Sequence, residues 1–189
     1  WLMIITIARQ CGCSGDKIGQ ALAEKYKIPF FDKEGIKKIA KEKGLLEKYP
    51  YFYGEMPLDT LIYSESENDP DSPLKKTPKV ALAELIGNEE CVVVGRCGNY
   101  AFKDREDIVS VFLCGKKENR IDAIAESHNV NFRKAKKIVE ETDARRLTYH
   151  KYYTGEEWGF AGNYDLCLNV AKIGEEATII TIDKFVETL

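Results

Sequence analysis

The sequence predicts an α/β fold in which a parallel sheet of about five strands lies between helices on both of its faces. Short, apolar, β-rich segments alternate along the chain with segments whose apolar residues recur at helical spacing. The strand-like segments are also unbroken apolar runs, as at residues 91–95, and such runs are typical of strands covered on both faces. We therefore expect a parallel sheet with two helical layers.

The first predicted unit is a strand, a glycine-containing loop and a helix. The strand covers residues 4–8, and the loop covers residues 11–15. Four apolar residues then recur at helical spacing: Ile18, Ala21, Leu22 and Tyr26. Pro29 ends this helix, and residues 30–31 form a minimal second strand.

The middle of the chain combines a second helix, an irregular segment and a central strand. Helical spacing continues through residues 36–40 and stops at Gly44. Between residues 45 and 79 the periodicity fades, and residues 64–73 are acidic and rich in Pro and Ser, so we expect a mobile insertion over 45–79. Helical spacing returns at residues 80–86 and precedes the strand at 91–95.

The C-terminal half repeats the alternation. Residues 108–114 and 165–170 are predicted strands, and residues 119–127 and 132–153 are predicted helices, the second one basic on its outer face. Residues 173–189 combine β-branched side chains with helix-forming ones, and we predict a helix. With 189 residues, the chain suits a single domain over residues 1–189.

Composition excludes several classes of protein. Lys and Arg number 28 against 31 Asp and Glu, so the net charge of -3 does not favour bulk binding to nucleic acid or to anionic membranes. The longest apolar run, residues 3–7, is far shorter than the ~20 residues that cross a bilayer. The start of the chain lacks the basic segment of a signal peptide, and the six cysteines lack the spacing of a metal site. We expect a cytoplasmic protein with no nucleic-acid or membrane partner and no metal-ligating residues; the oligomeric state stays open.

The first glycine-containing loop is the main candidate for ligand binding. A turn between the first strand of a parallel sheet and the next helix offers free N–H groups and a positive helix end to an anion. The full phosphate-loop pattern is G-x-x-x-x-G-K-[ST], but here Gln10 replaces the first glycine, Asp16 takes the lysine position and Lys17 takes the hydroxyl position. Two interpretations stay open, a phosphate-binding loop and a tight turn without a ligand.

Short blocks along nearly the whole chain occur in a distinctive order and spacing. They are ITIARQCGCSGDKIG at residues 5–19, IPFFD at 28–32, VVVGRCG at 92–98, VFL at 111–113, NRI at 119–121, TDARR at 142–146, YYTGEEWG at 152–159 and NYDLCLN at 163–169. Together they resemble the cytidylate kinase-like branch of the P-loop nucleoside monophosphate kinases. The resemblance implies a P-loop kinase fold with a helical lid over residues 120–160. It also implies phosphoryl transfer from ATP, with Mg²⁺, to a nucleoside monophosphate.

The resemblance also assigns residues. It places the ATP phosphates at the loop, on Gly12, Cys13, Ser14, Gly15, Asp16, Lys17 and Ile18. Lys17 is the candidate for the loop lysine, since a cation in the first turn could bend back toward a phosphate. The catalytic cations would be Lys17, Arg120, Arg145 and Arg146, and the acceptor would contact Asp32, Lys38, Arg96 and Asp143.

Alternatives remain for several of these residues. Arg96 follows a central strand, where α/β sheets bind ligands, but a surface salt bridge is the competing interpretation. Arg145 and Arg146 belong to a basic helix whose charges could simply be solvated. Asp143 could orient either of these two arginines, contact a ribose or form a helix pair with Arg146 three residues on.

Base specificity is not predicted, because the base-reading positions of cytidylate kinases correspond here to Thr142, Arg146 and Tyr149, none of the expected type. The aromatic residues between 149 and 158 could stack on a base or pack in the core. A domain of the same fold that binds nucleotides without turnover is the main alternative function.

Overall fold

The computed structural model describes residues 3–54, 73–87 and 89–189. Within them, five parallel strands form one sheet in the order β2-β3-β1-β4-β5. The strands are β1 (Ile4–Arg9), β2 (Phe30–Phe31), β3 (Cys91–Val94), β4 (Ile108–Cys114) and β5 (Leu166–Asn169). The predicted α/β class with a parallel sheet is confirmed.

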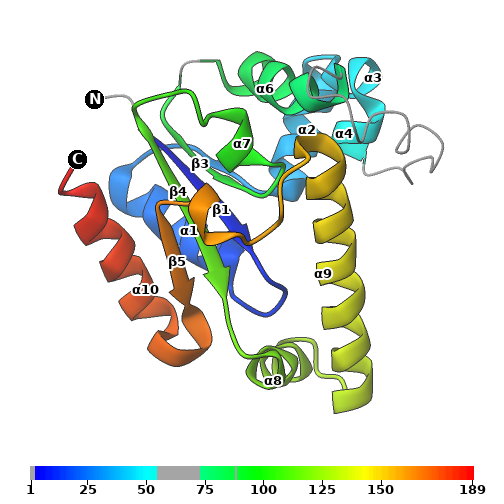
Figure 1. Cartoon of the computed structure of the whole chain (residues 1–189), viewed down its shortest axis with the longest axis vertical. Helices are drawn as coiled ribbons and strands as arrows, with labels where there is room; N and C mark the ends of the chain where they lie inside the picture. Colours follow the sequence, from blue (N-terminus) through cyan, green and yellow to red (C-terminus); the bar gives the residue numbers. More distant parts are fainter. Residues whose placement is uncertain (1–2, 55–72, 88) are drawn as a thin grey trace.

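Helices cover both faces of this sheet, as the unbroken apolar strands predicted (Figure 1). On one face, Ile18 and Leu22 of α1 (Gly15–Tyr26) and Ile182 of α10 (Val170–Val186) pack in a cluster with Ile5 and Val92. The residues next to these in sequence, including Ile4 and Val93, point to the other face of the sheet and pack there against a second set of helices. Successive strand residues point to opposite faces, so both sets are apolar and buried.

The second helical layer is built mainly from the middle of the chain. It comprises α2 (Lys33–Glu42), α3 (Leu45–Lys48), α4 (Pro50–Gly54), α6 (Pro73–Ile86) and α7 (Gly98–Ala101). Phe52 and Tyr53 of α4 are fully buried there beside Tyr153 from the far end of the chain.

A helical hairpin projects beyond the carboxyl ends of the strands. It consists of α8 (Lys117–Ser127) and the long α9 (Phe132–Thr154), and the short 3-10 helix η1 (Ala161–Asn163) follows before β5. Ile121 and Val139 of the hairpin pack with Cys11, so the hairpin rests on the loop between β1 and α1, residues 10–14, hereafter the β1–α1 loop. Figure 1 shows α9 running along one side of the sheet from α8 to the region of α4 and α6.

The structure differs from the sequence prediction over residues 45–79. The described parts of this segment are helical in α3, α4 and the start of α6, and residues 55–72, which hold most of the acidic 64–73 stretch, lie outside the described residues. Helices α3 and α4 have 4 and 5 residues, too few to show a helical period. Pro50 and Pro73 both stand at the first helical position, where the missing N–H costs nothing.

The last segment was ambiguous in sequence, and the prediction of a helix is confirmed by α10. Its β-branched residues Thr178 and Ile182 are buried against the sheet, which explains why they tolerate a helical conformation. No helix of the described residues is both long and apolar enough to span a lipid bilayer.

Candidate functional site

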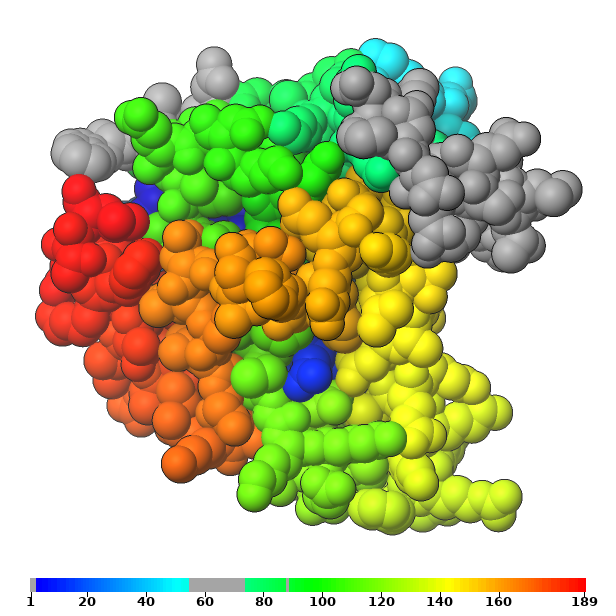
Figure 2. Space-filling view, in the orientation of Figure 1, coloured from blue at the N-terminus to red at the C-terminus, as the bar shows by residue number. Residues whose placement is uncertain are grey.

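Two neighbouring cavities open at the edge of the sheet where the central strands end. The first, the arginine cavity, has a volume of about 520 Å³ and is lined by residues from β1, the end of β3, α7 and α9. The second, the loop cavity, has a volume of about 700 Å³ and lies between the β1–α1 loop and the α8–α9 hairpin. Arg9 and Arg146 line both cavities and therefore stand where the two meet. In Figure 2, blue atoms of the N-terminal part of the chain are visible between α9 and the orange segment before β5.

The β1–α1 loop presents backbone N–H groups to the loop cavity. Gly12 has a φ of 86° and Ser14 a φ of 51°, and this left-handed backbone leads directly into α1. The first N–H groups of a helix have no acceptor within the helix. Among the described residues, no protein group accepts from the N–H of Gly12, Ser14, Gly15, Asp16 or Lys17. A row of free donors at the positive end of a helix suits an anion such as phosphate.

Two of the predicted loop residues have buried side chains. Ile18 of α1 is fully buried in the cluster between the helix and the sheet, and Cys13 is 1% exposed but also lines the loop cavity. Burial raises the pKa of the Cys13 thiol to about 12, so the thiol stays protonated at neutral pH.

Arg120 and Asp143 hold the β1–α1 loop against the helical hairpin. Oδ1 of Asp143 accepts from the N–H of Cys11 at 2.7 Å, and Oδ2 accepts from Nη1 of Arg120 at 2.6 Å. Arg120 also donates to the carbonyl oxygens of Cys11 and Gly115, each at 3.0 Å. The sequence analysis considered Arg145, Arg146 or a ribose as the partner of Asp143, and the structure instead pairs it with Arg120 of the neighbouring helix.

Lys17 and Asp16 lie at the rim of the loop cavity. Nζ of Lys17 is 3.8 Å from Oε1 of Glu175, and the side chain of Lys17 is 77% exposed. Oδ1 of Asp16 accepts from Nη2 of Arg9 at 3.3 Å.

Arg9 is the residue that the sequence analysis missed. It is the last residue of β1, and its side chain is only 13% exposed. Burial, with a further effect of Arg146, lowers the pKa of Arg9 to about 10, which leaves the guanidinium charged at neutral pH. The available signal was its place directly after an apolar central strand, the same argument that singled out Arg96.

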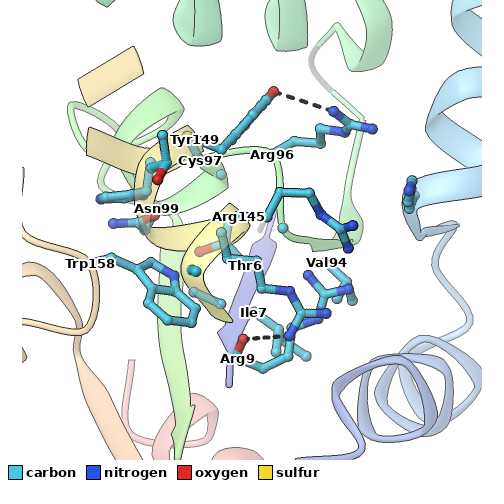
Figure 3. Close-up of a pocket in the computed structure, with 18 residues that line it drawn as sticks. Thr6, Ile7, Arg9, Val94, Arg96, Cys97, Asn99, Arg145, Tyr149 and Trp158 are labelled. Atoms are coloured by element: carbon cyan, nitrogen blue, oxygen red, sulfur yellow. Dashed lines mark hydrogen bonds between the residues drawn. The ribbon is translucent and has the colours of Figure 1, made fainter. Parts of the chain in front are cut away.

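The other arginines reach the arginine cavity from the turn after β3 and from α9. Figure 3 shows Arg9, Arg96 and Arg145 extending into this region from three different elements. Arg96, 6% exposed, donates to the carbonyl oxygen of Phe52 at 2.6 Å and so ties the end of β3 to α4. Nη1 of Arg146 donates to the carbonyl oxygen of Arg9 at 3.0 Å, and burial lowers the pKa of Arg146. Arg145 also lines the cavity.

The wall of the arginine cavity combines aromatic and buried polar groups. Oγ1 of Thr6 and Nε2 of His150 are buried and have no hydrogen-bond partner among the described residues. Burial lowers the pKa of His150 to about 4, so this imidazole is neutral at pH 7. Trp158, which meets Phe112 edge-on with centroids 5.5 Å apart, and Tyr149 also line the cavity, whereas Tyr152 and Tyr153 are buried in the core.

The two remaining predicted acceptor residues lie away from these cavities. Asp32 caps α2, because its Oδ1 accepts from the N–H of Gly35 at 2.7 Å. Lys38 is on the exposed side of α2. Neither residue lines the arginine cavity or the loop cavity, whereas Lys33, which sequence analysis did not single out, lines the arginine cavity.

The parallel sheet, the donor-rich loop after β1 and the arginines of a helical hairpin define the P-loop kinase fold. The chain belongs to the cytidylate kinase-like family, whose model matches residues 4–172. This confirms the family resemblance and the fold that it implied. No curated protein sequence matches the chain.

Solved structures support the same fold. An uncharacterized protein from Eubacterium ventriosum is 25% identical over 100% of both chains, with a TM-score of 0.73. A shikimate kinase from Bacteroides thetaiotaomicron is 13% identical over 98% of both chains, with a TM-score of 0.55. A gluconokinase from Sinorhizobium meliloti is 16% identical over 99% of this chain and 95% of that chain, with a TM-score of 0.53.

Proposed function

We propose that this protein transfers the terminal phosphoryl group of ATP to a nucleoside monophosphate. The observation that carries the proposal is the junction of two cavities at Arg9 and Arg146. A kinase needs two ligands that meet at the phosphoryl group, with cations around the meeting point, because the transition state spreads negative charge over the phosphoryl oxygens.

ATP would occupy the loop cavity, with its phosphates on the free N–H groups of the β1–α1 loop. A side chain at Gly12 would bring its Cβ to 2.6 Å from the carbonyl oxygen of Arg120, so the loop can pass this close to α8 only with glycine. The carboxylates that line this cavity are Asp16, Glu126 and Glu175. Mg²⁺ would enter with ATP and take most of its oxygen ligands from phosphate and water, as it does in kinases.

The acceptor would occupy the arginine cavity. Its phosphate would face Arg9, Arg145 and Arg146, whose guanidinium groups suit phosphate oxygens. Its base would lie toward Tyr149 and Trp158, where Thr6 and His150 have hydrogen-bonding atoms without a partner among the described residues. In the reaction, an oxygen of the acceptor phosphate bonds to the γ-phosphorus, the bond to the bridging oxygen breaks, and ADP leaves with that electron pair.

The second candidate is a domain of this fold that binds nucleotides without turnover. It is favoured by the aspartate at the usual lysine position of the loop and by the 77% exposure of Lys17. Both candidates require nucleotide binding, and they differ in whether ATP is consumed.

The test is an assay of ADP release from ATP and Mg²⁺ with a panel of nucleoside monophosphates, deoxy forms included. Shikimate and gluconate belong in the panel, because kinases of similar fold carry those names. We expect release that depends on one acceptor, and a loss of about 100-fold in kcat for Arg146→Gln. Arg133→Gln, an exposed change on the same helix, should leave the rate unchanged. ATP binding without release for any acceptor would instead favour the non-catalytic domain.

A further inference from the structure

Among the described residues, neither the β1–α1 loop nor the first turn of α1 places a buried cation at the junction of the two cavities. The position that carries lysine in the full phosphate-loop pattern is Asp16. The next residue, Lys17, lines only the loop cavity, and its Nζ lies beside Glu175 at the rim. A different residue must therefore balance phosphate charge at the junction.

Arg9 is held at that junction by the most rigid part of the fold. Its strand pairs with β3 on one side and β4 on the other, and the following N–H, of Gln10, donates to the carbonyl oxygen of Leu113 at 2.9 Å. A functional group on a central strand is positioned more exactly than one on a loop. Its side chain, 13% exposed, lines both cavities.

Two glycines leave the room that this side chain occupies. A Cβ at Gly15 would lie 2.7 Å from Cγ of Arg9, and a Cβ at Gly95 would lie 2.8 Å from Nη1. Both distances are shorter than a van der Waals contact, so any other residue at either position would displace the arginine. The start of α1 and the end of β3 thus enclose Arg9.

The charges around Arg9 are not balanced within the described residues. Arg146 is close enough to lower its pKa, and the ion pair of Arg9 is with Asp16, whose side chain is 61% exposed. The partly buried carboxylate of Asp143 is already engaged by Arg120. The guanidinium groups of Arg9 and Arg146 beside one exposed carboxylate leave a site for an anion.

We infer that Arg9 is a catalytic residue that replaces the missing loop lysine and binds the phosphoryl group passing between the two cavities. The inference rests on the proposed function and adds to it the residue that contacts the transferred group. A guanidinium can donate two parallel hydrogen bonds to two oxygens of one phosphoryl group, which an ammonium cannot do.

The first test measures binding of inorganic tripolyphosphate and of ATP by calorimetry, because neither experiment needs the acceptor. We expect Arg9→Gln to weaken both by about 10- to 100-fold, since a charged hydrogen-bond donor is lost. Arg9→Lys should recover only part of the affinity, because lysine keeps the positive charge but lacks the two parallel N–H donors of the guanidinium. Arg133→Gln, the matched control, removes an exposed guanidinium that lines neither cavity and should change the affinity by less than about threefold. A large loss in Lys17→Gln with none in Arg9→Gln overturns the inference.

A pair of glycine variants tests Arg9 without changing it. Gly95→Ala should displace the guanidinium and weaken tripolyphosphate binding, whereas Gly87→Ala, with a similar positive φ of 67° but nothing within 4 Å of the added Cβ, should not. Equal affinities in the two variants would count against the inference, and so would a folded Arg9→Gln protein with wild-type affinity.

The outcomes also separate this inference from the proposed function. If no acceptor supports ADP release but Arg9→Gln loses tripolyphosphate binding, the kinase reaction is wrong and the phosphate contact of Arg9 stands. If an acceptor supports turnover and Arg9→Gln keeps the wild-type kcat, the reaction stands and the role of Arg9 is wrong.

Discussion

Two arginines of the site show how burial alone does not define a role. Arg120 is 7% exposed at its side chain, and its donors are engaged by carbonyl oxygens and by Asp143. The side chain of Arg9 is 13% exposed, and among the described residues its one ion pair is with the exposed Asp16. The first guanidinium therefore stabilises the β1–α1 loop, and the second has donors left for a ligand.

A buried histidine predicts how stability depends on pH. Burial lowers the pKa of His150 from 6.5 to about 4. Between pH 4 and pH 6.5, the unfolded chain therefore binds a proton at His150 and the folded chain does not. The resulting contribution of His150 to the free energy of unfolding is fully present above pH 6.5 and is lost as the pH falls toward 4. We expect it to amount to about 3 kcal/mol.

Urea denaturation of wild type and His150→Gln at several values between pH 4 and pH 7 measures this contribution. The variant should lose the part of the pH dependence that His150 causes. His128→Gln, which replaces an exposed histidine, should keep the wild-type dependence. Identical curves for wild type and His150→Gln would contradict the prediction.

At the scale of elements, the ion pair between α8 and α9 also holds the β1–α1 loop through hydrogen bonds to Cys11. Asp143 of α9 contacts Arg120 of α8 and the N–H of Cys11 at once. A second ion pair, between Lys117 and Glu140, joins the same two helices, but its side chains are 47% and 44% exposed. The two pairs allow a direct comparison of a buried and an exposed contact between the same elements.

We expect Asp143→Asn to destabilise the protein by about 2–3 kcal/mol, because the buried charge of Arg120 loses its counterion. The same change should weaken tripolyphosphate binding, since it loosens the loop that carries the N–H donors. Glu140→Gln should leave both unchanged, because exposed pairs contribute little. Chemical denaturation and calorimetry measure the two effects, and equal results for the two variants would show that the loop is not held by Asp143.

At the scale of the whole molecule, ligands of both cavities should stabilise the fold. The β1–α1 loop, the sheet and α9 all line the cavities, so a ligand there bridges elements that separate on unfolding. At a hundred times its Kd a ligand adds about 2.7 kcal/mol, which corresponds to about 5–10 °C in Tm for a chain of this size. Thermal unfolding with ATP and Mg²⁺ should show this shift, and adenosine at the same concentration should give a smaller one. Equal shifts for ATP and adenosine would mean that the phosphates are not bound.

The sequence by itself determined the alternation of strands and helices, the parallel sheet and the place of the candidate loop. These features follow from local patterns, because unbroken apolar runs identify strands that are covered on both faces and a glycine-containing turn marks the start of α1. The place of Arg96 at the end of a central strand was predictable from the same kind of pattern, whereas Arg146 was assigned by the family resemblance.

Only the tertiary structure decided which charged groups are engaged and which are left for a ligand. Cys11 and Asp143 are separated by 132 residues, and Arg9 and Arg146 by 137, so no local pattern encodes their hydrogen bonds. The same holds for α4, whose five residues form a helix because Phe52 and Tyr53 are buried against Tyr153. Burial and charge pairing depend on neighbours that the fold brings together, which is why the position of Arg9 between the two cavities was visible only in the structure.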